Sequence, residues 1–463
     1  MTGVRLSQRP AQPADLLVRG ARLLDPLAKL DGALDLLVRG GRVAEIAAKG
    51  TLDAGAEVEV VEGEGLSLFP GFVDPHVHLR TPGREDEEDL ESGTRAAAAG
   101  GFCRVLAMPN TEPVTDNAAV LRALQERAGT EASIPVGFLA AITKGQHGQE
   151  LSEMEELART GAAGFTDDGV PVANARRLRQ ALQYQRLCGR VLALHEEDPA
   201  LSGEGVMHEG RLSALLGLAG IPSISESTMI ERDAALARYE RGRIHILHLS
   251  AAESVAAVER AKADGGEVTA EVTPHHLTLT DEAVRSLDPS FKMNPPLRAQ
   301  RDRHALLDGL RSGAIDCIAT DHAPHSREEK EAPFEQAPMG VIGLETAFAV
   351  LYTELVLPGV LPLELLIERL GAGARPYGLP VPTLAPDAPA DFCLVDLDAA
   401  WTVGDAGYES RSDNSCFAGR ELKGRVVLTV AGGSIAYRDR GFSIRLADDS
   451  FAAERLPAPQ GSA

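Results

Sequence analysis

The chain has 463 residues, a formal net charge of -22 at pH 7 and 44% hydrophobic residues. This length allows one large domain plus a smaller one, and the apolar content is enough for a sizeable core. The acidic balance argues against general nucleic-acid binding and against attachment to an anionic membrane surface. An anionic substrate would therefore need locally concentrated positive charge.

The cysteines and the first residues predict a cellular location. The five cysteines are scattered without a CxxC pair, which is typical of reduced thiols. The N-terminal residues lack the apolar core of a signal peptide, and no apolar run is long enough to span a membrane. We therefore expect a cytoplasmic protein.

Apolar runs and helical segments alternate along most of the chain. Short β-like pieces occupy residues 15–68, and from residue 70 short apolar runs alternate with longer segments of helical spacing. Eight runs follow, from LFPGFVDPHVH (68–78) to IDCIATDHAPH (315–325). Eight βα units over roughly 280 residues are typical of a TIM-type (β/α)8 barrel. An open doubly wound sheet is the alternative.

The β-like pieces return after about residue 380, in ADFCLVDLDAAWTV and GRVVLTVAGGSIAYRD. We expect them to pair with the N-terminal strands in one small β-sandwich domain. The predicted domains are residues 1–68 (N-terminal part of the small domain), 69–378 (catalytic barrel), 379–442 (C-terminal part of the small domain) and 443–463 (tail).

Polar residues follow the predicted strands, at the barrel end where active sites lie. In GFVDPHVHLR (71–80), His76, His78 and Arg80 occupy alternate positions and therefore share one face of a strand. Other strands end in Asn110, Asp168, His195, His248 and Asp321, and the loop after the seventh strand carries Asn294. By contrast, we interpret the acidic run REDEEDLESG (84–93) as the start of a helix.

Four histidines and two aspartates at one barrel mouth predict a metal site. Imidazole and carboxylate suit zinc and similar divalent ions, and six ligands suit two metals that share one carboxylate. Each residue alone has a plainer explanation: Asp168 before Gly169 could form a turn, and Asp321 could cap a helix. Their joint placement at strand ends favours the metal site.

PGFVDPHVHLR, followed by FTDDG, ALHEED, ILHLS, TPHHL, KMNPPLR and ATDHAPH, resembles the amidohydrolase superfamily and, within it, the class I dihydroorotases of bacteria. The resemblance covers roughly residues 15 to 440. In many relatives, including hydantoinases, a carboxylated lysine from the fourth strand bridges two metals. GAAGFTDDGVPV (161–172) contains no lysine. The resemblance instead implies Asp168 as the bridging ligand.

The resemblance also implies roles for individual residues. Two zinc ions per chain would be bridged by Asp168 and a hydroxide, one bound by His76, His78 and Asp321 and the other by His195 and His248. The implied substrate contacts are His78, Arg80, Asn110, Asn294, His325, Met339 and Gly340. Relatives usually have Phe-Gly where this chain has Met339-Gly340, so we expect the backbone contact rather than aromatic packing. His275 and His276 are expected to be structural, and we expect no metal at His208.

The activity that the resemblance implies is the reversible closure of N-carbamoyl-L-aspartate to L-dihydroorotate in pyrimidine (UMP) biosynthesis. Asp321 would take the proton of the attacking water and hand it to the leaving nitrogen. Ring closure would start with Asp321 protonated, which favours cyclisation at lower pH and hydrolysis at higher pH. Arg80 matches a substrate carboxylate bidentately. The charged segment 325–340 is expected to cover the site.

The remaining expectations concern partners and alternatives. The resemblance implies at least a homodimer, and a complex with aspartate transcarbamoylase is possible. No nucleic acid or membrane partner is expected. The alternative functions are another cyclic amidase, such as an allantoinase or hydantoinase, and a non-catalytic partner subunit of aspartate transcarbamoylase.

Overall fold

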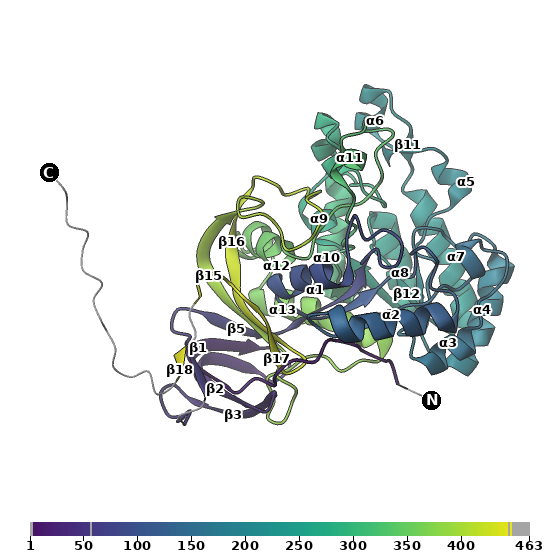
Figure 1. Ribbon diagram of the computed structural model, residues 1–463. Coiled ribbons are helices and arrows are strands. Elements are labelled where there is room, and N and C mark those ends of the chain that lie inside the picture. Colours follow the sequence, from purple (N-terminus) through teal and green to yellow (C-terminus); the bar gives the residue numbers. More distant parts are fainter. Residues whose placement is uncertain (1–2, 56–57, 443–444, 447–463) are drawn as a thin grey trace.

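The computed structural model describes residues 3–55, 58–442 and 445–446, and it contains the predicted barrel (Figure 1). Its parallel strands are β6 (Phe72–Val77), β7 (Phe102–Ala107), β8 (Val136–Phe138), β9 (Leu192–Leu194), β12 (Arg243–Ile246), β13 (Glu267–Val272) and β14 (Cys317–Ile318).

The fourth barrel strand is reduced to one residue. Phe165 forms parallel bridges to Ala140 on one side and to Leu192 on the other, so it joins the two halves of the sheet. A parallel bridge between Val77 and His322 closes the ring. The prediction of a closed barrel is therefore correct, and the open doubly wound sheet is excluded.

The barrel helices pack outside the strands, as Figure 1 shows for α2, α3, α4, α7 and α8. The longer helices are α1 (Leu90–Ala99), α2 (Ala118–Glu131), α3 (Met154–Thr160), α4 (Ala175–Cys188), α7 (Ile224–Glu240), α8 (Ala252–Ala263), α10 (Gln300–Ser312) and α13 (Leu363–Gly371). The shorter ones are α5 (Pro199–Ser202), α6 (Arg211–Leu216), α9 (Pro274–Thr278), α11 (Arg327–Lys330) and α12 (Ala347–Leu351).

The N-terminal and C-terminal segments form one mixed, nine-stranded sheet beside the barrel, as predicted. Its strands are β1 (Leu16–Asp25), β2 (Leu30–Arg39), β3 (Arg42–Ala48), β4 (Glu59–Glu62), β5 (Ser67–Pro70), β15 (Phe392–Thr402), β16 (Glu421–Ala431), β17 (Ser434–Arg438) and β18 (Arg445–Leu446). The central contact is antiparallel pairing of β15 with β5, with Leu394 opposite Leu68. Most of the predicted tail, from residue 447, lies outside the described residues.

Aromatic packing connects this sheet to the barrel and sets the position of β6. The Phe348 ring lies 5.7 Å from Phe69 of β5 and 5.6 Å from Phe72 of β6. Only Gly71 separates β5 from β6, and a Cβ there would lie 2.6 Å from Cys103 Cβ, so no larger residue fits. The strand that carries His76 and His78 is therefore anchored at its start by a close-packed core.

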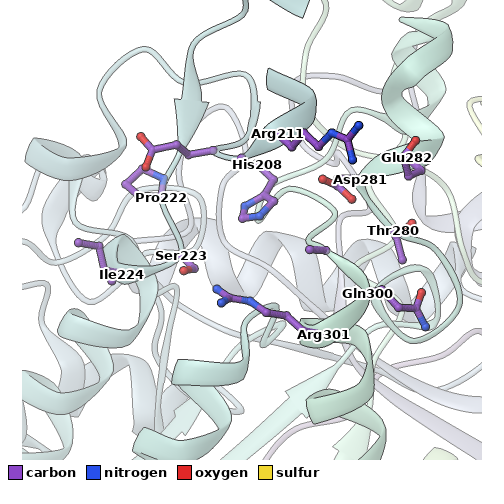
Figure 2. Close-up of a pocket in the computed structure, with 13 residues that line it drawn as sticks. His208, Arg211, Pro222, Ser223, Ile224, Thr280, Asp281, Glu282, Gln300 and Arg301 are labelled. Atoms are coloured by element: carbon purple, nitrogen blue, oxygen red, sulfur yellow. The ribbon is translucent and has the colours of Figure 1, made fainter. Parts of the chain in front are cut away.

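Two long excursions extend the barrel at its mouth, residues 199–223 and 274–299. Met207, Leu212, Val284 and Phe334 form a small core between them. The same excursions line a cavity of about 660 Å³ (Figure 2). Among the residues that the structure describes, no helix is both long and apolar enough to cross a membrane.

Candidate metal centre and active site

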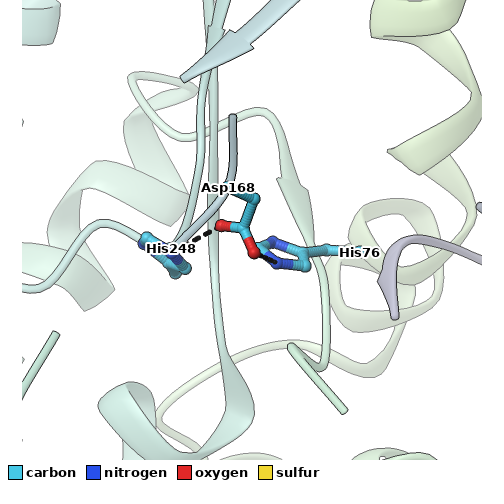
Figure 3. A group of neighbouring side chains, drawn as sticks. All are labelled: His76, Asp168 and His248. Atoms are coloured by element: carbon cyan, nitrogen blue, oxygen red, sulfur yellow. Dashed lines mark ion pairs between the residues drawn. The ribbon is translucent and has the colours of Figure 1, made fainter. Parts of the chain in front are cut away.

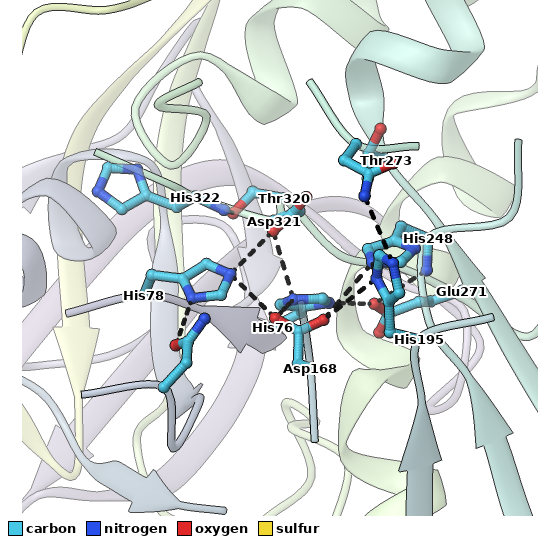
Figure 4. A network of polar contacts seen from close by, with 12 residues as sticks. His76, His78, Asp168, His195, His248, Glu271, Thr273, Thr320, Asp321 and His322 are labelled. Carbon is cyan, nitrogen blue, oxygen red and sulfur yellow. Dashed lines mark hydrogen bonds and ion pairs between the residues drawn. The ribbon is translucent and has the colours of Figure 1, made fainter. Parts of the chain in front are cut away.

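The six side chains predicted as metal ligands lie together at the barrel mouth (Figure 4). They come from the ends of five strands, and each is buried. Two sets of three have ligand atoms within 4.8 Å of one another: His76, Asp168 and His248, and His76, His78 and Asp321. Side chains from segments far apart in the sequence therefore meet, as predicted from their positions after the barrel strands.

The Asp168 carboxylate lies between the two halves of this cluster (Figure 3). Its Oδ2 atom is 3.5 Å from His76 Nε2 and 3.4 Å from His78 Nε2. Its Oδ1 atom is 3.7 Å from His195 Nδ1 and 3.6 Å from His248 Nε2. Each carboxylate oxygen thus faces one pair of histidines, the arrangement that a shared ligand requires.

Asp321 and the second histidine pair complete the cluster. Asp321 Oδ1 lies 3.1 Å from His78 Nε2 and 3.3 Å from His76 Nε2. On the other side of Asp168, His195 Nδ1 is 3.0 Å from His248 Nε2. In each half of the cluster, nitrogen and oxygen ligand atoms therefore lie around one small space.

Two buried atoms in the cluster have no hydrogen-bond partner, namely His76 Nε2 and Asp168 Oδ1. An unpaired buried polar atom costs free energy, and native proteins rarely leave one unsatisfied. A cation between these atoms would satisfy both. Imidazole nitrogen with carboxylate oxygen is a donor set that zinc accepts. The residues present therefore fit a metal ion.

The electrostatics of the cluster favour ionised carboxylates. Burial raises the pKa of Asp168, but His76, His248 and His78 outweigh it and hold that pKa well below its usual range. Burial likewise opposes ionisation of Asp321, and His76 and His78 lower its pKa below the ordinary value. Both side chains are thus available as anionic ligands.

Three residues at the site have a left-handed backbone conformation, which residues other than glycine rarely adopt. The φ angles are 52° at Arg80, 28° at His248 and 50° at Asp321. Such conformations cost about 1–3 kcal/mol each and persist where the surrounding structure determines them. These conformations occur at three predicted site residues. The surrounding fold therefore fixes the directions of these side chains although the backbone conformation is unfavourable.

Glu271 supports His76 from behind, and sequence reasoning missed it. Its Oε1 atom lies 2.7 Å from His76 Nδ1, and its Oε2 atom lies 3.0 Å from His245 Nε2. The carboxylate fixes the His76 proton on Nδ1, so the Nε2 lone pair faces the cluster. Burial raises the pKa of Glu271, but His76 and His245 lower it to about 2. A charged residue in the buried strand EVTAEV was the available signal.

The other histidines are oriented by polar partners as well. His78 Nδ1 lies 2.9 Å from Asn110 Oδ1. His195 Nε2 lies 3.3 Å from Glu197 Oε2, which also accepts a hydrogen bond of 2.7 Å from Asn294 Nδ2. The two asparagines predicted to contact substrate therefore also hold the histidine frame, and Glu197 was not predicted.

Arg80, His325 and Met339 meet on one side of the cluster, at a rim that Glu87 organises. Arg80 Nε donates to Pro324 O at 3.0 Å and lies 3.1 Å from Glu87 Oε2. His325 Nδ1 lies 3.2 Å from Glu87 Oε1, and His325 Nε2 lies 2.9 Å from Met339 O. One edge of the Arg80 guanidinium is thus anchored.

The small sheet contributes to this rim through the segment between β15 and β16. Asn414 Nδ2 donates to Ala323 O and to Gly340 O, each at 3.1 Å. Gly340 has a φ of 134°, and a Cβ there would lie 2.8 Å from Ala323 Cβ. Only glycine fits this position, and its backbone N–H donates to Lys292 O at 2.9 Å while its carbonyl accepts from Asn414.

The segment 325–340, the predicted cover, joins the rim through His325 and Met339, and two buried lysines hold it there. Lys292 Nζ donates to Glu335 O at 3.0 Å and to Ala337 O at 2.7 Å. Lys330 Nζ donates to Pro289 O and to Pro338 O, each at 2.9 Å. The cover is therefore fastened to the loop that carries Asn294.

The neighbouring histidines that follow the seventh strand are held in the protein interior. His276 Nδ1 is 2.8 Å from Thr273 Oγ1, and His276 Nε2 is 3.0 Å from Pro295 O. Burial lowers the pKa of His275 to about 4. His208 lines the separate cavity and hydrogen-bonds with Arg298.

The chain is similar to proteins of known activity. Residues 65–254 match the family described as Dihydro-orotase-like. The chain is 46% identical to a dihydroorotase of Pelotomaculum thermopropionicum, over 92% of this chain and 99% of the relative. It is 45% identical to a dihydroorotase of Anaeromyxobacter dehalogenans, over 92% of this chain and 98% of the relative.

Solved structures show the same fold in other cyclic amidases. An L-hydantoinase (dihydropyrimidinase) from Arthrobacter aurescens has a TM-score of 0.82 and 26% identity, covering 92% of this chain and 96% of the neighbour. A dihydropyrimidinase from Brevibacillus agri has a TM-score of 0.80 and 22% identity, over 93% and 97%. The much higher identity to the dihydroorotases decides between these groups: the chain belongs to the dihydroorotase family of cyclic amide hydrolases.

Proposed function

We propose that the six clustered side chains bind two zinc ions with Asp168 as the shared ligand, and that the site interconverts N-carbamoyl-L-aspartate and L-dihydroorotate. The observation that carries this proposal is the Asp168 carboxylate between two histidine pairs. His76, His78 and Asp321 would complete one site, and His195 and His248 the other. When bound, zinc would lower the pKa of a water molecule to about 7 and polarise the ring carbonyl.

Asp321 is the proton carrier in this proposal. In hydrolysis the attacking water gives one proton to Asp321 and one to the ring nitrogen as the C–N bond breaks. In ring closure the departing carboxylate oxygen leaves as water, with one proton from the attacking nitrogen and one from Asp321. Closure therefore starts with Asp321 protonated. Lower pH should favour closure and higher pH hydrolysis.

The rim supplies recognition of the substrate carboxylate. The Nε edge of Arg80 is occupied by Pro324 O and Glu87, which leaves its Nη groups for a planar, bidentate contact. His325 lies beside it, with its Nε2 atom 3.4 Å from Arg80 Nη2. Asn110, Asn294, His78 and the Met339-Gly340 backbone would surround the ring.

The wider setting of the enzyme is part of the same proposal. The barrel, residues 69–378, would be the catalytic domain, with residues 1–68 and 379–442 as the small domain. The scattered cysteines are all free and buried among the described residues, which supports a reducing cytoplasmic setting. We propose a homodimer, with aspartate transcarbamoylase as a candidate partner.

A paired assay on the purified protein tests the proposal. Elemental analysis would count metals per chain, and ring absorbance would follow hydrolysis of L-dihydroorotate, for wild type and Asp168→Ala. We expect about two zinc ions per chain in the wild type, and loss of metal and turnover in the variant. Bound metal without dihydroorotate turnover would point to another cyclic amide or to a partner-subunit role. Turnover that survives in the variant would exclude Asp168 as bridge.

A further inference from the structure

A polar cavity of about 660 Å³ opens beside the barrel mouth, and the proposed reaction does not use it (Figure 2). Its lining comes from the excursion that contains β10 (Met207–His208) and β11 (Gly220–Ile221), and from the segments before α7 and α10. None of its lining residues belongs to the metal cluster or the substrate rim. The volume is in the range of small-molecule sites.

Two buried polar groups face this cavity without a partner there. His208 is 7% exposed, and its Nδ1 atom is 3.2 Å from Arg298 Nη1, which donates to it. The proton of a neutral His208 therefore lies on Nε2, which faces the cavity. Ser223 is 8% exposed, and its hydroxyl makes no cap hydrogen bond to α7. Within the described part of the chain, neither His208 Nε2 nor Ser223 Oγ has a hydrogen-bond partner.

The protonation state of His208 makes it a neutral donor. Burial lowers the pKa of His208 to about 4, and the charge of Arg298 acts in the same direction. At neutral pH the ring thus presents one N–H to the cavity and carries no charge. The Nε2–H of His208 and the Ser223 hydroxyl both open on the cavity, where a ligand that accepts hydrogen bonds can bind them together.

Two helix starts and the Arg301 side chain lie on the same side of the cavity as Ser223. α7 and α10 both begin there, with 17 and 13 residues, and neither has a side-chain cap at Ser223 or Ala299. Uncapped helix starts favour anions. The Arg301 guanidinium lines the cavity at the start of α10, with Glu253 3.1 Å from its Nη2 atom and Asp302 3.7 Å from its Nε atom. Arg211 and Glu209 line the cavity as well, and Figure 2 shows Arg211 near Asp281.

The opposite side of the cavity is acidic. Figure 2 shows Asp281 and Glu282 across from Ser223 and Arg301. Arg285 already binds Glu282 at 2.7 Å, whereas Asp281 makes no ion pair among the described residues. A carboxylate at this place repels a second anion and accepts hydrogen bonds from hydroxyl or amino groups. No Phe, Tyr or Trp lines the cavity, so it offers no stacking surface for a nucleobase.

We propose that this cavity binds a small non-aromatic anion, a phosphate or carboxylate, that also carries hydroxyl or amino groups. The anionic group would lie against His208, Ser223 and Arg301, at the starts of α7 and α10. The hydroxyl or amino groups would face Asp281. This inference is independent of the dihydroorotase reaction, because it rests on residues outside that site.

Isothermal titration of the full-length, metal-loaded protein tests the proposal, with glycerol 3-phosphate, inorganic phosphate and glycerol as probes. We expect glycerol 3-phosphate to bind more tightly than phosphate, and glycerol not to bind. Arg301→Ala should weaken binding of glycerol 3-phosphate at least ten-fold, and Ser223→Ala about three-fold. Arg159→Ala, which removes an exposed arginine paired with Glu155 on α3, is the control and should change nothing.

Several results would overturn the proposal. One is the absence of binding at 20 mM glycerol 3-phosphate, a concentration chosen as an upper limit. Another is equal binding by wild type, Arg301→Ala and Ser223→Ala, which would place the anion elsewhere, for example at the metals. Equal affinity for phosphate and glycerol 3-phosphate would remove the role of Asp281. Unchanged thermal unfolding and dihydroorotate turnover in each variant would show that its fold is intact.

Discussion

The metal cluster and the substrate rim lie side by side, yet they are built in different ways. The cluster consists of side chains that follow strand ends, and Glu271 on a neighbouring barrel strand supports it. The rim consists of loops, and its supports come from distant segments: Glu87 before α1, Lys292, Lys330, and Asn414 from the small sheet. Strand ends fix geometry through the barrel itself, whereas loops need added contacts.

This difference predicts two classes of variant. Changes in the cluster should affect metal binding and the chemical step. Changes in the rim should affect substrate binding or stability, with the metals retained.

The largest effect is expected at Asp321, the proton carrier of the cluster. Asp321→Asn should lower kcat in both directions by about 10²–10⁴-fold, because the proton relay is lost. Hydrolysis uses the ionised form of Asp321, and ring closure uses the protonated form. Hydrolysis should rise with pH and ring closure should fall. Rates measured in both directions across pH check this.

Asp316→Asn is a matched control for this experiment. Asp316 lies at the amino end of β14, where Lys262 Nζ is 2.7 Å from its Oδ2 atom, whereas Asp321 follows the carboxyl end. Its loss should affect stability and leave kcat unchanged. Identical pH profiles in the two directions would exclude the proposed role of Asp321.

The second effect concerns the support of the cluster. Glu271→Gln removes the anion that fixes the His76 proton on Nδ1, and should weaken metal binding about 10–100-fold. Competition with a chelator measures this, and turnover should recover when metal is in excess. Glu267→Gln, at the exposed start of the same strand, is the control. Unchanged metal affinity in Glu271→Gln would show that the barrel alone orients His76.

The same division explains what could be predicted from the sequence. The clustering of five side chains could be predicted because each of them follows an apolar run, which the barrel fold places at the mouth. These side chains are His76, His78, Asp168, His195 and Asp321. Glu87 was not found, because REDEEDLESG has the composition of an acidic helix start. The helix does begin there, with Asp89 as its cap, but Glu87 is turned inward and buried.

Other differences also arise from tertiary contacts. The fourth strand is a single bridge at Phe165, because its neighbours supply both sets of hydrogen bonds over a very short length. The hydrogen bonds of Lys292 and Lys330 to backbone carbonyls could not be predicted from the residues around either lysine. Structural similarity alone would not have chosen the function, since hydantoinases share the fold and the higher sequence identity to dihydroorotases separates the two groups.

In the rim, Glu87→Gln should raise the KM for dihydroorotate about ten-fold, with metal content and kcat retained. A buried carboxylate that contacts Arg80 and His325 together is replaced by an amide, which can accept from only one of them, and a lost charged hydrogen bond costs at least about 1.5 kcal/mol. Steady-state kinetics and metal analysis test this. Asp86→Asn, on the exposed neighbour, should change neither quantity. A fall in kcat at unchanged KM would place Glu87 with the chemistry rather than with recognition.

The smallest effect is a pH dependence of stability that originates at the cover. Burial lowers the pKa of Lys330 to about 8, from about 10.4 in an unfolded chain. The unfolded chain then binds more protons above pH 8, so the free energy of unfolding should rise with pH in that range. Relative to Lys330→Met, the wild type should gain about 1 kcal/mol between pH 7 and pH 9.

Urea unfolding at both pH values measures this difference, and titrations elsewhere cancel because the two proteins share them. Lys423→Met, at an exposed position of β16, should show no such change relative to wild type. A difference between wild type and Lys330→Met that stays constant with pH would mean that Lys330 keeps an ordinary pKa. Lys330 would then hold the cover as a charged ammonium group, and burial would not lower its pKa. A gain with pH would show instead that the loop-built rim depends on a buried group whose charged form is disfavoured by burial.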